Sequence, residues 1–175
     1  MKTLSIALLV AALGVALPAS AQWIGFNPSE TVPSNEVFTV DLVLDTEGEV
    51  IMGVDALFSF DPAVVRLDSV TIGDWFSGAP QPSFFWADAA TGVPGVARVI
   101  GSVVTTGRDG SGALAVLHFT AVAAGFSPLS FLAVTVRDPL NAPVPVTPST
   151  GDRIIIEEAI DVRAAGFGEV QALYR

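Results

Sequence analysis

His118 is the chain's one histidine, and acid–base or metal chemistry would have to start from it. A nucleophilic mechanism needs a nucleophile and an orienting acid that converge on such a histidine, and a zinc site needs three or four ligands. The chain has no cysteine to supply either role. Along residues 113–122, His118 alternates with Leu117 and Phe119, which places it on the opposite face of a strand. We interpret His118 as a surface residue and predict no metal site and no cofactor.

Carboxylates are the second group that could act on a substrate, because glycosidases use two acidic side chains that flank a cleft. The chain has 18 acidic residues, so number alone always supplies a plausible pair. Asp41, Asp55 and Asp88 lie within predicted strands, and Glu157 and Glu158 form a short charge run. No pair is distinguished by its context, and we predict a non-catalytic protein with a solvated acidic surface. A cleft with two facing carboxylates would instead favour a glycan-processing enzyme.

The glycine-rich segment over residues 106–112 (TGRDGSG) could be mistaken for an ion-binding or phosphate-binding loop. It holds one carboxylate, Asp109, where a calcium loop uses several. It also lacks the lysine of a phosphate-binding loop. We therefore predict that this segment is a hairpin connection between two strands.

A cluster of aromatic residues is more informative. Alternation along the predicted strand over residues 83–88 puts Phe84 and Trp86 on one face and Phe85 on the other. Because one face of a sandwich sheet is normally core, a buried Phe85 leaves Phe84 and Trp86 exposed, beside Leu57 on the neighbouring strand. An exposed aromatic face of this kind marks an interface. The alternative is that the preceding loop folds over this face and hides it.

The first residues predict export. Lys2 precedes an uncharged apolar run, and Ala19 and Ala21 place small residues where a signal peptidase cleaves. The run is shorter than the roughly 20 residues that a membrane-spanning helix needs. We predict a Sec signal peptide over residues 1–21 and a mature chain that starts at Gln22. That chain would be secreted, to the extracellular space or the periplasm, with no membrane attachment.

Charge narrows the class of partner. Removal of the signal peptide also removes Lys2, the one lysine. Seven arginines then stand against 18 acidic residues, which is a net charge near −11. Such a surface repels nucleic acid and anionic lipid, because both are bound through basic patches. We predict no nucleic-acid partner, and the oligomeric state is left open.

Short alternating segments indicate an all-β sandwich. The chain has 16 glycines and 12 prolines, and the stretches between them are β-branched and alternate in polarity. About nine strands are predicted within one domain over residues 22–156, and residues 157–175 form a poorly specified tail. The segments assigned are 37–44, 51–60, 64–70, 83–88, 96–104, 113–122, 128–137 and 153–156.

Three of these stretches resemble the cohesin family. They are residues 38–44 (FTVDLVL), residues 54–65 (VDALFSFDPAVV), and residues 110–121 (GSGALAVLHFTA), in which a glycine-rich turn leads into a strand that alternates toward a phenylalanine. The matches fall in order across roughly residues 26–156. The resemblance implies a nine-stranded jelly-roll-like β-sandwich. It also implies a non-catalytic module that binds dockerins, which are small paired-calcium-loop domains, through one flat sheet face.

The resemblance also implies which residues form the binding face. The recognition surface is predicted to consist of three adjacent groups: Asp55, Leu57 and Ser59; Phe84, Trp86 and Asp88; and Arg98 and Ile100. The partner would be a dockerin-like or other extracellular protein.

Carbohydrate binding is the alternative, because the same sandwich superfamily contains carbohydrate-binding modules. In that case Trp75, in a predicted loop, would join Phe84 and Trp86 as a platform on which a polysaccharide stacks. A sugar platform needs coplanar exposed rings, whereas a protein interface mixes a few aromatics with aliphatic and charged residues. The mixture predicted here, which includes Leu57 and Arg98, favours a protein partner.

Overall fold

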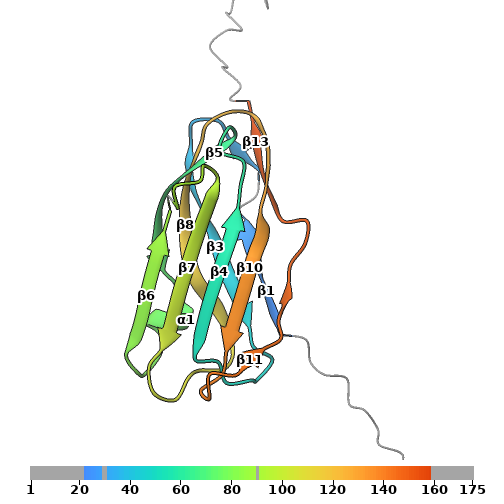
Figure 1. The fold of residues 1–175 in the computed structure, drawn as a ribbon. Coiled ribbons are helices and arrows are strands. Elements are labelled where there is room, and N and C mark those ends of the chain that lie inside the picture. Colours follow the sequence, from blue (N-terminus) through green and yellow to red (C-terminus); the bar gives the residue numbers. More distant parts are fainter. Residues whose placement is uncertain (1–21, 29–30, 90, 159–175) are drawn as a thin grey trace, which may run out of the picture.

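The computed structural model describes residues 22–28, 31–89 and 91–158, and nearly every described element is a β-strand. Two five-stranded sheets pack face to face, and a small three-stranded sheet closes one end (Figure 1). The predicted β-sandwich is therefore confirmed. The predicted signal peptide, with Ala19 and Ala21 at its end, lies outside the described residues, as do residues 159–175 of the predicted tail; Glu157, the first residue of that tail, belongs to strand β13.

The two large sheets are named after their central strands. The β3 sheet has the order β12-β1-β3-β8-β5 and the β4 sheet has the order β11-β10-β4-β7-β6. The strands of the β3 sheet are β12 (Thr147–Pro148), β1 (Trp23–Pro28), β3 (Val37–Asp45), β8 (Ser111–Ala121) and β5 (Val65–Ile72). Those of the β4 sheet are β11 (Pro143–Val144), β10 (Ser130–Arg137), β4 (Gly53–Ser59), β7 (Val96–Val103) and β6 (Ser83–Asp88). The small sheet contains β2 (Val32–Pro33), β13 (Arg153–Glu157) and β9 (Gly125–Pro128).

The core lies between the two large sheets and follows the predicted alternation. On β3 the inward residues are buried and their neighbours are not, and β4 repeats the pattern. Burial of one large aliphatic or aromatic side chain contributes about 1.5–3 kcal/mol, so the registers of these strands are strongly specified. The inward residues of the two strands are Val40, Leu42 and Leu44 on β3 and Val54, Ala56 and Phe58 on β4.

The segment of Trp75 was predicted to be a loop, but Trp75 and Phe76 lie in the short helix α1 (Asp74–Ser77). Both side chains are fully buried, and their rings meet edge to face with centroids 5.0 Å apart. Trp75 Nε1 donates to the carbonyl of Gly110 at 3.4 Å. The guanidinium of Arg108 donates to the carbonyls of Asp74 and Trp75. Four residues cannot sustain a helix alone, so burial of the two rings holds α1 in place.

The glycine-rich segment over residues 106–112 is not the hairpin that was predicted. It leads from β7 in the β4 sheet to β8 in the β3 sheet, so the chain crosses from one layer to the other. Paired backbone hydrogen bonds between Ile51 and Arg108, at 2.8 and 2.7 Å, hold the crossing segment. Turn residues predict a reversal of the chain, but they do not determine to which sheet the next strand belongs.

The ends of the described sandwich are tied by backbone hydrogen bonds. The carbonyl of Gln22, the first described residue, accepts from Thr147 N at 2.7 Å. The carbonyl of Glu157, the last residue of β13, accepts from Ser34 N at 2.9 Å.

The predicted strand over residues 128–137 is divided at Leu129 into β9 and β10. Strand β1 was not among the predicted segments.

We predict that Gly101→Ala destabilises the domain by about 1–3 kcal/mol, the usual cost of overpacking a core. A Cβ on Gly101 would lie 2.3 Å from Cζ of the buried Phe76. The matched control is Gly53→Ala on the adjacent strand, where the nearest atom to a Cβ is 3.7 Å away. Urea unfolding followed by tryptophan fluorescence measures both. Equal stability of the two variants would show that Phe76 does not need the space above Gly101.

A candidate protein-binding face on the β4 sheet

All eight predicted binding residues lie on the outer face of the β4 sheet, and none of them is buried. They occupy alternate positions of three strands, whose intervening residues point into the core. Figure 1 looks onto this sheet, with β6, β7, β4 and β10 side by side. The residues are Asp55, Leu57 and Ser59 on β4, Arg98 and Ile100 on β7, and Phe84, Trp86 and Asp88 on β6.

The order of the strands differs from the expectation. Because β7 lies between β4 and β6, Trp86 is not beside Leu57 but pairs with Ile100. Leu57 pairs with Arg98, which in turn pairs with Asp88. The face therefore has two cross-strand rows, in which β7 supplies the central residues. The prediction that the strand of Leu57 lies beside that of Trp86 is therefore wrong, because β7 follows β6 in the chain and inserts between β6 and β4.

An ion pair lies at the centre of the face. Arg98 donates from Nε to Asp55 Oδ1 at 2.8 Å and from an Nη to Asp55 Oδ2 at 2.5 Å. The two residues are diagonal neighbours, since Asp55 pairs with Ile100. The hydrogen bonds to the Asp55 carboxylate, together with its charge, raise the pKa of Arg98 above its ordinary value. This two-pronged geometry holds both long side chains along the sheet surface and compensates each charge.

Phe84 and Trp86 are exposed, as predicted, with 53% and 43% of their surfaces accessible. Phe85 points inward and packs toward Phe76, with ring centroids 6.2 Å apart. The segment before β6 does not cover the face, because α1 buries its aromatic rings inside the sandwich. The alternative of a hidden aromatic face is therefore wrong.

The platform of three rings proposed for sugar binding is not formed. Trp75 is completely buried against Phe76 and contributes no ring to the surface. Two of its members, Phe84 and Trp86, remain on the outer face. The sequence analysis placed Trp75 in a loop, and the local sequence carried no sign that this segment folds inward.

Strand β10 adds residues that the sequence analysis missed. A β-bulge interrupts its pairing with β4 between Phe131 and Ala133. The extra residue, Leu132, is 56% exposed and stands next to Ala133, the strand partner of Leu57. A bulge turns a side chain that would point inward toward the other face. The one signal in the sequence was the run of four apolar residues FLAV, which breaks the alternation of the strand.

The face is balanced in charge although the chain carries a net charge of −10. Its outward positions include two carboxylates, Asp55 and Asp88, and two of the seven arginines, Arg98 and Arg137. Arg137 ends β10 and donates to the carbonyl of Asn141 at 2.9 Å. The excess of negative charge therefore lies elsewhere on the molecule, and this face can approach a partner without a requirement for a basic surface.

His118 lies on the outer face of the β3 sheet, as predicted, where its Nε2 is 3.0 Å from Thr71 Oγ1. Within residues 22–28, 31–89 and 91–158, no group of three or more metal-ligating side chains comes together. No helix in the same part of the chain is long and apolar enough to span a membrane.

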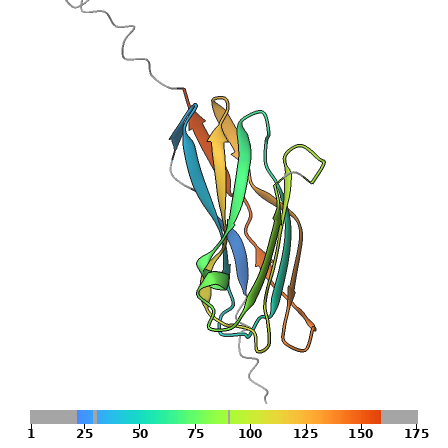
Figure 2. The same ribbon diagram turned by 90° about the vertical axis from the view of Figure 1, so that its left-hand side faces the viewer.

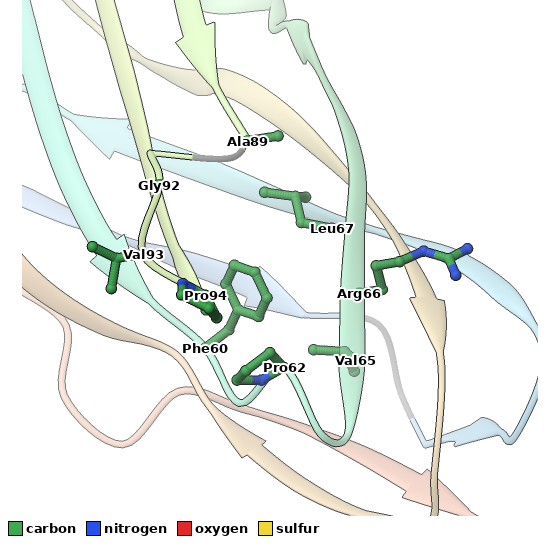
Figure 3. A pocket seen from close by; sticks show the side chains of 10 residues that line it. Phe60, Pro62, Val65, Arg66, Leu67, Ala89, Gly92, Val93 and Pro94 are labelled. Carbon is green, nitrogen blue, oxygen red and sulfur yellow. The ribbon is translucent and has the colours of Figure 1, made fainter.

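Two hollows bear on the enzyme alternative. A pocket of about 310 Å³ opens between β5 and the segment over residues 92–95, and its lining is apolar apart from Arg66 (Figure 3). A groove on the β3 sheet has carboxylates in its lining: Asp41, Asp45 and Asp74. Two of them have structural roles, because Asp45 accepts from Glu47 N at 3.0 Å and Asp74 accepts from Ala113 N at 2.7 Å.

A second polar cluster joins β5 to β8 on the outer face of the β3 sheet. A bulge between Leu67 and Ser69 turns Asp68 toward the surface, where it accepts from Thr120 Oγ1 at 2.5 Å and from Arg66 Nε at 2.6 Å. These bonds, with that from Thr120 the stronger, lower the pKa of Asp68 below its ordinary value of 3.8.

Comparison with known proteins agrees with this architecture. No family model and no curated protein matches the sequence. Three solved structures with similar folds are a non-cellulosomal cohesin from the archaeon Archaeoglobus fulgidus, the sixth cohesin of Acetivibrio cellulolyticus scaffoldin B in complex with a Cel5 dockerin, and a cohesin module from a Clostridium perfringens family 33 glycoside hydrolase.

The alignments cover nearly all of each similar module and about four fifths of this chain, at low sequence identity. The Archaeoglobus cohesin has a TM-score of 0.66 at 15% identity, over 85% of this chain and 99% of its own. The Acetivibrio and Clostridium modules both have TM-scores of 0.63, at 17% and 15% identity. Each alignment covers 79% of this chain, with 100% of the Acetivibrio module and 97% of the Clostridium module. The described part of the chain is a β-sandwich with a charge-balanced outer face on the β4 sheet. More specifically, it has a cohesin-like fold.

We predict that Thr120→Val raises the pKa of Asp68 toward its ordinary value, because the strongest of its hydrogen bonds is lost. A carboxyl with a lowered pKa stabilises the fold above that ordinary value, and the contribution disappears as the pH falls through the lowered one. The variant should therefore lose less stability on acidification than the parent. NMR titration of the Asp68 carboxyl carbon measures the shift. Thr71→Val, which removes only the bond to His118, should leave that titration unchanged.

Proposed function

We propose that this chain is a secreted, non-catalytic module that binds a dockerin-like protein partner through the outer face of the β4 sheet. The observation that carries the proposal is the composition of that face. It combines exposed aromatic and aliphatic side chains with the central Arg98–Asp55 ion pair, and it is neutral on an otherwise acidic protein.

The physical character of the face suits a protein partner. Trp86 and Arg98 belong to the residue types that contribute most to protein interfaces. Leu57 and Ile100, the strand partners of Arg98 and Asp55, place apolar side chains beside the ion pair, and Leu132 adds exposed apolar surface on β10. Burial of the exposed part of one tryptophan, on the order of 100 Å², contributes roughly 2–3 kcal/mol before the costs of association. An apolar surface with one compensated ion pair matches a helical partner that presents aliphatic side chains and few charges.

The similar structures support this assignment, because one of the cohesins was solved with a dockerin bound to it. Dockerins are held together by calcium, so chelation should release a partner of this kind. The effect would act on the partner, because no group of three or more metal-ligating side chains comes together in the described part of this chain. Polysaccharide binding is the alternative, and its proposed platform lacks Trp75, which is buried. The binding experiment below distinguishes it from a protein partner.

We predict that this domain retains a specific protein from the culture supernatant of the producing cell, and that EDTA releases it. Trp86→Ala should weaken the interaction roughly 30-fold, since truncation of an interface anchor costs about 2 kcal/mol or more. Leu57→Asp should abolish it, because it replaces an apolar contact with a second carboxylate beside Arg98, and a bound partner would have to desolvate that added charge. Affinities measured by calorimetry with the recovered partner decide this.

The matched control is Val37→Asp, which introduces the same charge at an exposed position on the outer face of the β3 sheet. It should bind like the parent. Loss of binding in Val37→Asp with no effect of Leu57→Asp would move the interface to the other sheet. Retention that soluble polysaccharide blocks, or binding to insoluble glycan with no protein retained, would favour the carbohydrate alternative.

We predict that the exported protein begins at Gln22. Intact-mass spectrometry of the secreted fraction should give the mass of residues 22–175. Ala21→Phe should leave the signal peptide attached, because a large side chain does not fit at the cleavage position, whereas Ser20→Ala should be processed normally. Full-length protein in the cytoplasm of the producing cell, with none exported, would contradict the assignment of residues 1–21 as a signal peptide.

A further inference from the structure

Each large sheet has two edges, and three of the four edges are protected against pairing with another chain. The two-residue strands β11 and β12, which contain Pro143 and Pro148, end the two sheets on one side. On the other side, β5 carries a bulge and the charged pair Arg66 and Asp68. Bulges, prolines and charges are the usual devices that prevent edge-to-edge association.

Strand β6 is the fourth edge, and its one such device is a charge at its end. It runs without a bulge from Ser83 to Asp88, contains no proline and carries one charge at its end. Figure 1 shows β6 at the left-hand margin of its sheet with no strand beyond it, and Figure 2 views the molecule from this side. A straight edge with exposed aromatic residues is a template for another strand.

The backbone pairing shows which groups of β6 are available. Val104 N donates to the carbonyl of Pro82 at 2.8 Å, in continuation of the register that pairs Ser83 with Val103. Hydrogen-bonding direction alternates along an antiparallel strand. The backbone groups of Phe84 and Trp86 therefore face β7 as well. The backbone groups of Ser83, Phe85 and Ala87 point away from β7, in the plane of the sheet. Ser83 and Ala87 are each two residues from Phe85, so the three positions are spaced evenly about it.

We propose that β6 pairs antiparallel with β6 of a second copy of this chain, about a two-fold axis at Phe85. In this register the two Phe85 residues form a hydrogen-bonded pair, and Ser83 hydrogen-bonds with Ala87 of the second copy. Phe84 then stands opposite Trp86 of the second copy, and this contact occurs twice. These are non-hydrogen-bonded pairs, in which side chains approach most closely.

A second copy fits this edge better than an unrelated strand does, for two reasons. The exposed rings of Phe84 and Trp86 cover each other in pairs without help from any other residue. The single charge, Asp88, stands opposite Pro82 of the second copy, so no like charges face each other. Because the axis is perpendicular to the sheet, both β4 faces point the same way. The outward residues of β4 and β7 remain open, whereas the dimer covers the rings of Phe84 and Trp86 and therefore competes with the proposed partner for them. The inference does not depend on the proposed function.

The contact area predicts a weak dimer. Phe84 and Trp86 are about half exposed, so four rings supply on the order of 400 Å² of covered surface, well below the roughly 1,200 Å² of a standard interface. Each chain also carries a net charge of −10, and the two copies repel each other. Association should therefore depend on concentration and should strengthen as salt screens that repulsion.

The register is tested first by disulfide trapping, because the chain contains no cysteine. In Phe84→Cys/Trp86→Cys, each new thiol would face its counterpart at a Cα separation of roughly 4.5 Å, within the range that a disulfide spans. The expected product under mild oxidation is a dimer linked twice. Phe84→Cys alone should not form a dimer, because its two thiols are offset by about 7 Å along the strand. Rapid dimer formation by Trp86→Cys alone would overturn the register.

Self-association is tested by light scattering after size exclusion, at concentrations from about 1 µM to about 1 mM, where weak dimers become populated. The parent should approach dimer mass at the upper end, more readily in high salt. Phe84→Lys/Trp86→Lys and Phe84→Glu/Trp86→Glu should each remain monomeric. An equimolar mixture should form a heterodimer, since lysine then faces glutamate at both pairs. A parent that stays monomeric at the highest concentration, or a mixture that does not associate, would overturn the proposal.

Discussion

The rest of the structure depends on one apolar core layer, which is packed between the β3 sheet and the β4 sheet. Strand β3 contributes Val40, Leu42 and Leu44 to it, and β4 contributes Val54, Ala56 and Phe58. Because side chains alternate along a strand, burial of one set commits the other set to solvent. The outward positions of β4, β7 and β6 are thus consequences of the core. A slip of one residue in β4 would bury Asp55 and expose Phe58, at a cost of several kcal/mol.

The helix α1 extends this constraint to the edge of the sheet. Phe76 lies beneath β7 in space that Gly101 leaves free, and its ring approaches that of Phe85 on β6. Trp75 fills the neighbouring space and is anchored through Gly110. The last strand of the β4 sheet is therefore supported from below. This support explains how a short edge strand holds two exposed aromatic rings on an ordered surface.

Charge distinguishes the two outer surfaces. The β4 face carries two carboxylates and two arginines, and the Arg98–Asp55 bonds keep the central charges compensated. The groove on the β3 sheet instead holds Asp41, Asp45 and Asp74. A neutral, partly apolar surface on an acidic molecule can be desolvated at lower cost than the remainder. The acidic remainder keeps the protein soluble and disfavours indiscriminate contact.

The sequence by itself determined the β-sandwich class and the face on which each binding residue lies. The alternation that exposes Phe84 and Trp86 and buries Phe85 is local, with a period of two residues, and it can be counted along the chain. Tertiary structure decided what depends on distant pairing. It inserted β7 between β4 and β6, sent residues 106–112 across to the other sheet, buried Trp75 and turned Leu132 outward through a bulge. Local pattern encodes which side of a strand a residue occupies, whereas neighbours in a sheet are selected by the packing of the whole core.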